Sequence, residues 1–228
     1  MSYRSVSFAN SEFYHVYNRG VDKRTIFRDA TDYRRFLELL YLSNSTHSIN
    51  IRDIRKVFDI VYVYDRDQQY VHIGAYCLMP NHFHILLTPL RENGVQNFMQ
   101  KLSTGYSMYF NKRYERTGTL CESKFKAQHA DSDEYLKYLF SYIHLNPAKL
   151  IEPHWKDPGV FDLGKLKTYV EGYEYSSLRD YLEVYRTEEK ILNPETFPPY
   201  FSSKKMVDAE LVDWLTLGED MPHFRGKA

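Results

Sequence analysis

The chain has 228 residues, its 30 Lys and Arg residues are balanced by 30 Asp and Glu, and its mean hydropathy is −0.56. Aromatic residues make up 16% of it, which excludes a disordered chain. No apolar run approaches the roughly 18 residues of a membrane span, no signal peptide is evident at the N-terminus, and two cysteines are too few for a disulfide framework. A cytoplasmic protein with one main domain and an appendage is therefore expected.

The charges are unevenly distributed along the chain. Residues 1–28 carry five bases and two acids, a net charge of +3, and residues 101–130 carry six bases and two acids, a net charge of +4. Residues 151–200 reverse this, with ten acids and six bases, a net charge of −4. Aromatic residues are interleaved with the bases of 101–130, which is compatible with a nucleic-acid face. Ordinary solvated helix faces would explain the same charges.

The first half of the chain predicts a strand, a helix and a hairpin. Residues 12–19 are typical of a strand that ends at Gly20, and 31–44 carry apolar side chains at helical spacing. The following segment, 45–70, is hard to interpret, although 59–65 has the composition of a strand. Two further strands, 71–79 and 82–88, are joined by the turn pair Pro80-Asn81 and predict a hairpin.

The second half predicts a long helix over 94–115, a strand over 124–130 and a helix from Asp131 or Ser132 to Leu145, where Asn146-Pro147 would stop it. The order β-α-β-β-α-β followed by a helix predicts an α+β fold with a ferredoxin-like split βαβ core and a central antiparallel sheet. The strand 82–88 would then lie inside the sheet. Composition changes near residue 150, so we expect the main domain over 1–150 and an appendage over 151–228 packed on it.

The strongest local signal is PNHFHILL, residues 80–87. Side chains alternate along a strand, so His82 and His84 share one face and Phe83 lies on the other. Their backbones would be about 6–7 Å apart, which allows both imidazoles to reach one metal ion. Taken alone, this spacing is more often a hydrogen-bonded pair of histidines than a metal site.

A second signal is YIHLNP, residues 142–147, at the end of a predicted helix. Tyr142 and Asn146 are four residues apart and share a helix face, whereas His144 faces elsewhere. The chain has 21 tyrosines, and most tyrosines pack with a satisfied hydroxyl, so Tyr142 by itself indicates no chemistry.

Together with YHVYNRG at 14–20, these two motifs resemble the IS200-like single-tyrosine transposases, and more closely the branch associated with repetitive extragenic palindromes. The family belongs to the HUH endonucleases, in which a bulky apolar residue, here Phe83, separates the two histidines. The similarity spans most of residues 12–182. Three separated motifs in one order are far more specific than any one of them.

The resemblance implies a transposase that nicks and joins single-stranded DNA beside palindromic hairpins through a 5′-phosphotyrosine. It implies that His82 and His84 bind Mg²⁺ or Mn²⁺ and that Tyr142 is the nucleophile. Asn146 takes the place of the third metal ligand, which is often Gln in the family, and would ligate directly or through a water. Relatives include dimers that exchange the tyrosine helix, so both a monomer and a homodimer remain open.

Candidate DNA contacts follow from the basic segments. Arg19 closes the strand that should neighbour the histidine strand. The other candidates for the DNA backbone are Lys101, Lys112, Arg113, Lys124 and Lys126, and those for base stacking are Tyr106, Tyr109 and Tyr114. Solvated lysines and core tyrosines are competing explanations, and a structural hydrogen bond suits His15 at least as well as a functional one. The family commonly has Trp and Arg in the stretch where this chain reads GTLCESKFKA, 118–127.

Two other classes of protein share part of this pattern. A non-catalytic protein that recognises DNA hairpins is the alternative, although every expected active residue is present. A His-x-His hydrolase of small molecules normally needs further ligands on later strands of a barrel, and this order of elements supplies no barrel. No role is predicted for 45–70 or for the acidic segment near the C-terminus.

Overall fold

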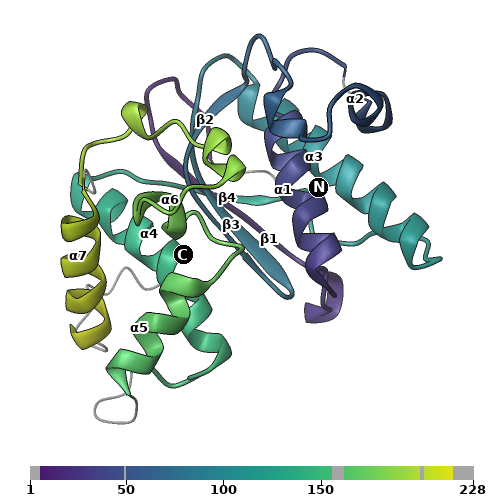
Figure 1. Ribbon diagram of the computed structural model, residues 1–228. Helices are drawn as coiled ribbons and strands as arrows, with labels where there is room; N and C mark the ends of the chain where they lie inside the picture. Colours follow the sequence, from purple (N-terminus) through teal and green to yellow (C-terminus); the bar gives the residue numbers. More distant parts are fainter. Residues whose placement is uncertain (1–5, 49, 156–161, 201–202, 218–228) are drawn as a thin grey trace.

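In the computed structural model, the described residues are 6–48, 50–155, 162–200 and 203–217. Four strands form one sheet: β1 (Tyr14–Arg19), β2 (Val71–Met79), β3 (His82–Pro89) and β4 (Lys126–His129). Their order is β2-β3-β1-β4, and every neighbouring pair is antiparallel (Figure 1). This is the predicted ferredoxin-like arrangement, with β3 and β1 inside the sheet.

The register of the two inner strands gives the sheet one apolar face and one face that carries polar groups. Val16 pairs with Ile85, and both side chains belong to the larger apolar core. The next pair along the strands, Tyr17 with His84, lies on the opposite face because side chains alternate. The predicted histidine face is therefore the face away from the larger core.

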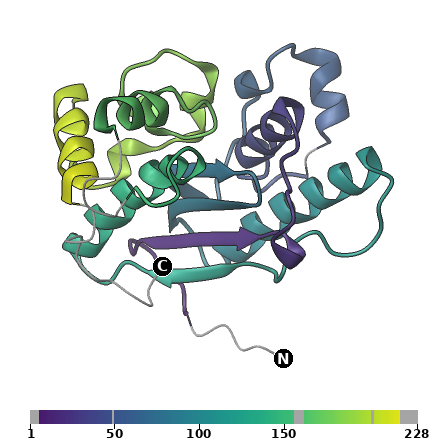
Figure 2. The ribbon, with the colours of Figure 1, turned by 90° about the horizontal axis from the view of Figure 1, so that it is seen from below.

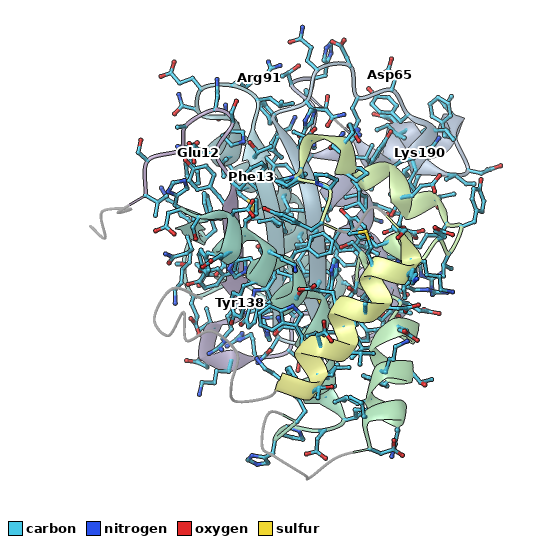
Figure 3. The ribbon with its side chains drawn as sticks, turned by 90° about the vertical axis from the view of Figure 1, so that its left-hand side faces the viewer. Glu12, Phe13, Asp65, Arg91, Tyr138 and Lys190 are labelled. Atoms are coloured by element: carbon cyan, nitrogen blue, oxygen red, sulfur yellow. The ribbon has the colours of Figure 1, made fainter. Side chains whose placement is uncertain are left out.

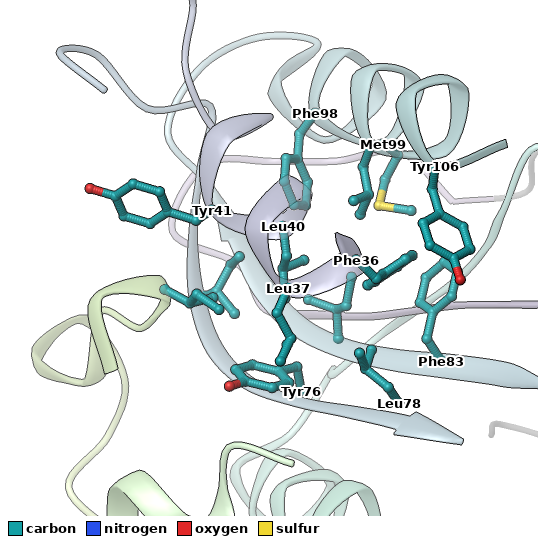
Figure 4. Packing of buried hydrophobic residues seen from close by; sticks show 14 of the residues in the cluster. Phe36, Leu37, Leu40, Tyr41, Tyr76, Leu78, Phe83, Phe98, Met99 and Tyr106 are labelled. Carbon is teal, nitrogen blue, oxygen red and sulfur yellow. The ribbon is translucent and has the colours of Figure 1, made fainter. Parts of the chain in front are cut away.

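Helices α1 (Ala30–Leu42) and α3 (Gly94–Arg113) cover the apolar face. Figure 4 shows Phe36 of α1 directed towards Phe83 of β3, and their ring centroids are 4.9 Å apart. Asp29 caps α1 by accepting hydrogen bonds from the backbone N–H groups of Thr31 and Asp32. Phe83 is thus a core residue, as its place between the histidines predicts.

The other face is covered by α4 (Asp133–Leu145), with α5 (Leu163–Gly172), α6 (Leu178–Tyr181) and α7 (Lys204–Leu217) outside it (Figure 2). Ser132 caps α4 by accepting from the backbone N–H of Tyr135. Tyr138 of α4, labelled in Figure 3, lies 5.6 Å from the Trp214 ring of α7. The sheet is therefore sandwiched between two helical layers, and α4 is held against its polar face from outside.

Segment 173–177 extends this packing to the edge of the sheet. The backbone N–H of Leu78 donates to the Tyr175 carbonyl, and that of Ser177 donates to the Tyr76 carbonyl, both at 2.9 Å. An open strand edge would present unpaired backbone groups, so this segment protects β2.

The structure corrects two details of the sequence prediction. The segment 59–65 is not a strand: it contains a 3-10 turn, Val61–Val63, in which Val61 and Tyr62 are buried. Packing in a turn therefore explains its alternating apolar residues. Asn146-Pro147 ends the α-helix but not the helical path, because a 3-10 helix runs over Asn146–Leu150 with proline in its first turn, where its missing N–H costs little.

The remaining short elements are α2 (Ile51–Val57) and the 3-10 turns Val21–Lys23, Thr187–Ile191 and Pro194–Thr196. Within the described residues, no helix has the length and apolar character needed to cross a membrane.

Candidate active site

The two histidines of β3 stand side by side on the polar face of the sheet. Their ring centroids are 4.9 Å apart, and the ring planes are perpendicular. Nδ1 of His82 lies 2.6 Å from Oδ1 of Asn81, and Nδ1 of His84 lies 2.8 Å from Nε2 of His15. With both Nδ1 atoms engaged, Nε2 is the ring atom that each histidine can offer to a ligand.

His15 supports this arrangement from the neighbouring strand β1. It is fully buried, and its ring lies against those of both His84 and Tyr17, with centroid separations of 5.0 and 4.9 Å. A hydrogen bond between two neutral imidazoles requires one ring to donate and the other to accept. If Nδ1 of His84 donates to His15, then Nε2 of His84 carries a lone pair directed into the site.

Helix α4 delivers Tyr142 to the same place within the same chain. Its ring centroid lies 5.5 Å from that of His84 and 6.0 Å from that of His15, with the planes nearly perpendicular. Tyr142 and His84 are 58 positions apart in the sequence, and the packing of α4 on the sheet brings them together. His144 points elsewhere, as expected, and its Nε2 lies 2.7 Å from Oγ of Ser177.

Asn146 lies one turn after Tyr142 and is almost completely buried. Its Nδ2 donates to the backbone carbonyl of Tyr142 at 2.8 Å, which fixes the orientation of the amide. Among the residues that the structure describes, its buried Oδ1 has no hydrogen-bond partner, and neither has Nε2 of His84. Buried polar atoms in native structures are normally satisfied, so each such atom calls for an explanation.

Burial determines the protonation of the site. It lowers the pKa of His82 to about 4 and that of His15 to about 3, and it lowers the pKa of His84 well below the ordinary value. The charges of Arg19 and Lys149 lower the His82 pKa further. The imidazoles are therefore neutral near pH 7, the form in which histidine is a metal ligand.

The tyrosine hydroxyl has the opposite shift. Burial raises the pKa of Tyr142, and hydrogen bonding from the Asn146 side chain and the charge of Arg19 partly oppose that effect. The phenol is protonated near neutral pH, and a protonated phenol is a weak nucleophile.

Lys149 is a residue at the site that sequence reasoning missed. Its Nζ lies 5.4 Å from the centre of the Tyr142 ring, in the 3-10 helix that continues α4. Its spacing of seven residues from Tyr142, about two helical turns, is the signal that could have identified it. On the other side, Arg19 pairs in register with His82. Two cationic residues thus border the histidine pair.

The donor set fits a divalent cation. Nε2 of His82, Nε2 of His84 and Oδ1 of Asn146 are nitrogen and oxygen donors, and two of them are the unpartnered buried atoms. Within the described parts of the chain, no cluster of three or more His, Cys, Asp or Glu side chains could hold a metal. A site here would therefore be completed by Asn146, phosphate or water, and it would be open, unlike a closed structural site.

The predicted DNA contacts do not all lie on the sheet face that carries the histidines. Arg19 lies at the site, and Lys126 of β4 pairs with Tyr17 and so lies on the same sheet face. Lys124 is exposed in the loop before β4, and Lys112 is exposed near the end of α3, in the opposite layer.

Arg113 forms ion pairs with two carboxylates of the protein. Its NH2 and NH1 atoms lie 2.7 Å from carboxylate oxygens of Asp29 and Asp32, so its charge is already paired. Lys101 donates to two backbone carbonyls, those of Ser45 and His47. Arg113 and Lys101 therefore have structural roles.

The tyrosines suggested for base stacking are held by the larger core. Tyr106 is buried and donates to the Ile26 carbonyl, and the hydroxyl groups of Tyr109 and Tyr114 donate to Asp32. The core explanation is correct for Tyr106.

Residues 43–146 match the family model described as "Transposase IS200 like". The matched segment contains His82, His84, Tyr142 and Asn146, and it confirms the resemblance that the motifs indicate. A solved structure of a REP-associated tyrosine transposase bound to a REP hairpin is also similar, with a TM-score of 0.51 and 12% sequence identity. The similarity covers 82% of this chain and 90% of that one, and at this identity it shows a common fold. No curated protein matches the sequence.

Proposed function

We propose that this IS200-like transposase cleaves and rejoins single-stranded DNA through a covalent bond to Tyr142. The observation that carries the proposal is the approach of the Tyr142 ring to within 5.5 Å of the His84 ring in one chain. A nucleophile beside two neutral imidazoles and two cationic side chains is suited to the cleavage of a phosphodiester.

In the cleavage step, the Tyr142 Oη forms a bond to phosphorus, and the bond from phosphorus to the preceding 3′ oxygen breaks. The phenol loses its proton and the departing oxygen gains one, which leaves a 5′-phosphotyrosine and a free 3′-hydroxyl. A phenolate is a better leaving group than an alkoxide, because phenols are the stronger acids. A second 3′-hydroxyl can therefore reverse the step and join two strands without ATP.

The metal ion is part of the proposal. Mg²⁺ or Mn²⁺, held by His82, His84 and Asn146, would neutralise charge on the scissile phosphate. Arg19 and Lys149 would orient the phosphate and balance the charge that develops in the displacement. The Asn146 bond to the Tyr142 carbonyl would fix the spacing between the nucleophile and the third ligand.

A hairpin beside a single strand is the proposed substrate. A tyrosine enclosed by a sheet and a helical layer must receive an exposed phosphate, which favours an unpaired strand over a continuous duplex. The solved structure of similar fold carries a REP hairpin, which supports the same class of substrate and the branch associated with repetitive extragenic palindromes. Because Tyr142 meets the histidines of its own chain, the step needs no exchange of helices, and a homodimer is not required for it.

The test is covalent capture. Wild-type protein incubated with Mn²⁺ and a hairpin carrying single-stranded flanks should give a DNA–protein adduct that survives denaturing electrophoresis. Tyr142→Phe should lose the adduct and keep its affinity for the hairpin, while Tyr138→Phe serves as a control on the same helix. An adduct that persists in Tyr142→Phe would refute the assignment. Hairpin binding without any adduct from the wild-type chain would identify a non-catalytic hairpin-binding protein instead.

A further inference from the structure

A basic cavity lies outside the site described above. It has a volume of about 510 Å³ and is lined by Arg24, Thr25, Arg28, Phe110 and Arg116. It is formed by the loop after β1 and the C-terminal end of α3. None of these five residues belongs to the predicted DNA contacts.

Three guanidinium groups converge there with little compensating charge. Arg24 pairs with Asp22 at 3.7 Å, and Asp22 is largely exposed. Arg116 donates to the neutral amide of Asn111, and Arg28 lies over the Tyr114 ring at 4.2 Å. Like charges held together repel one another, and an anion bound between them would relieve this repulsion.

Aromatic rings hold Arg28 and Arg116 in place, and the Nε of Arg24 donates to the Val21 carbonyl. The Arg28 guanidinium is 5.5 Å from the centre of the Phe110 ring, and that of Arg116 is 5.9 Å from the same ring. Phe110 is completely buried, so it provides a rigid base for both. Planar guanidinium groups fixed in this way can bind phosphate oxygens with little loss of side-chain entropy.

The cavity is connected to the candidate active site by backbone hydrogen bonds. The N–H groups of Ile26 and Phe27 donate to the Pro80 carbonyl at 2.8 and 3.0 Å, and the N–H of Gly20 donates to the Asn81 carbonyl at 2.9 Å. Pro80 and Asn81 form the turn immediately before His82. The loop after β1, which carries Arg24 and Arg28, is thus fixed to the same end of the sheet as Arg19 and His82. Figure 2 shows the segment that follows β1 beside the loop that follows α3.

We propose that Arg24, Arg28 and Arg116 form a binding site for a backbone phosphate of the single-stranded DNA that flanks the cleavage position. The strand would pass from the histidine pair around the Pro80-Asn81 turn into the cavity. The inference rests on the proposed function for its substrate, and it adds a second anchoring point that holds the strand in register.

The test uses the full chain with the double variant Arg28→Gln/Arg116→Gln and two hairpin oligonucleotides, one with long single-stranded flanks and one whose flank ends one nucleotide beyond the scissile phosphate. On the long substrate, affinity should fall about 10-fold and the salt slope of log K should decrease by about 0.7 for each lost phosphate contact. The trimmed substrate should bind both proteins equally. Arg34→Gln/Arg52→Gln, which removes two exposed arginines elsewhere, should change neither.

Two further measurements separate charge from packing. Arg28→Lys/Arg116→Lys should retain most of the affinity, and neutral methylphosphonate linkages in the long flank should weaken binding to the wild-type protein. Equal binding of natural and methylphosphonate flanks would overturn the proposal, as would an unchanged salt slope in a folded Gln variant. Adduct formation by wild-type protein on the trimmed substrate reports on the proposed function separately.

Discussion

Nε2 of His15 lies 2.8 Å from Nδ1 of His84, and this contact joins the two inner strands directly beside Tyr142. The residues are 69 positions apart, and neither Nδ1 of His15 nor Nε2 of His84 has a hydrogen-bond partner in the described part of the chain. A metal-bound histidine usually donates its second N–H to a neighbouring group, which fixes its tautomer and orientation. His15 is placed to receive that bond, so we propose a positioning role for it.

Replacing His15 with Ala should weaken Mn²⁺ binding about 10- to 100-fold, because His84 loses the group that orients it. Isothermal titration of the protein with Mn²⁺ measures this without relying on cleavage. His15→Gln supplies an acceptor and should recover part of the affinity. Equal Mn²⁺ affinities in the wild type and both variants would remove the positioning role.

Asn146→Ala should raise the Mn²⁺ concentration needed for half-maximal adduct formation by about 10-fold, since it removes the buried oxygen that completes the ligand set. Chelation of the metal should abolish the adduct in both proteins, and added Mn²⁺ should restore it. Asn97→Ala, at an exposed amide of α3 in the opposite helical layer, is the matched control. If Asn146→Ala responds to Mn²⁺ like the wild type, the amide is not a ligand.

Lys149→Met should slow adduct formation by roughly 100-fold while hairpin affinity changes little, because it removes a positive charge 5.4 Å from the Tyr142 ring, where the phosphate would react. Single-turnover rates at saturating DNA measure the effect separately from binding. Lys165→Met removes an exposed lysine from α5 and should leave the rate unchanged. A loss of affinity with an unchanged rate would make Lys149 a binding residue only.

The sequence predicted the sheet well because its signals are local. The hairpin of β2 and β3 follows from two alternating segments around Pro80-Asn81, and Phe83 between the histidines marks the side that faces the core. The turn at Val61–Val63 was mistaken for a strand because buried residues in a turn can alternate as they do in a strand. Its location depends on packing against other elements.

The site was predictable in its parts but not in its contacts. His82, His84 and Tyr142 were identified from motifs, whereas the role of His15 depends on the register between β1 and β3. That register is a tertiary property, and no local pattern indicates which residue of YHVYNRG meets His84. The sequence did not indicate Lys149, because the helix was expected to stop at Pro147. In the structure the chain continues from α4 as a 3-10 helix that includes Lys149.

Arg113 and Lys126, both predicted as DNA contacts, should behave in opposite ways. Arg113 pairs with Asp32, whose side chain is fully buried, so Arg113→Met should lower the melting temperature and leave the salt dependence of hairpin binding unchanged. Lys126 is exposed on the histidine face, so Lys126→Met should leave the melting temperature unchanged and reduce the salt slope by about 0.7. Thermal melts and anisotropy titrations at several salt concentrations measure both effects. A reduced slope in Arg113→Met would mean that DNA competes with Asp29 and Asp32 for this guanidinium, and the nucleic-acid face would then extend over the end of α3.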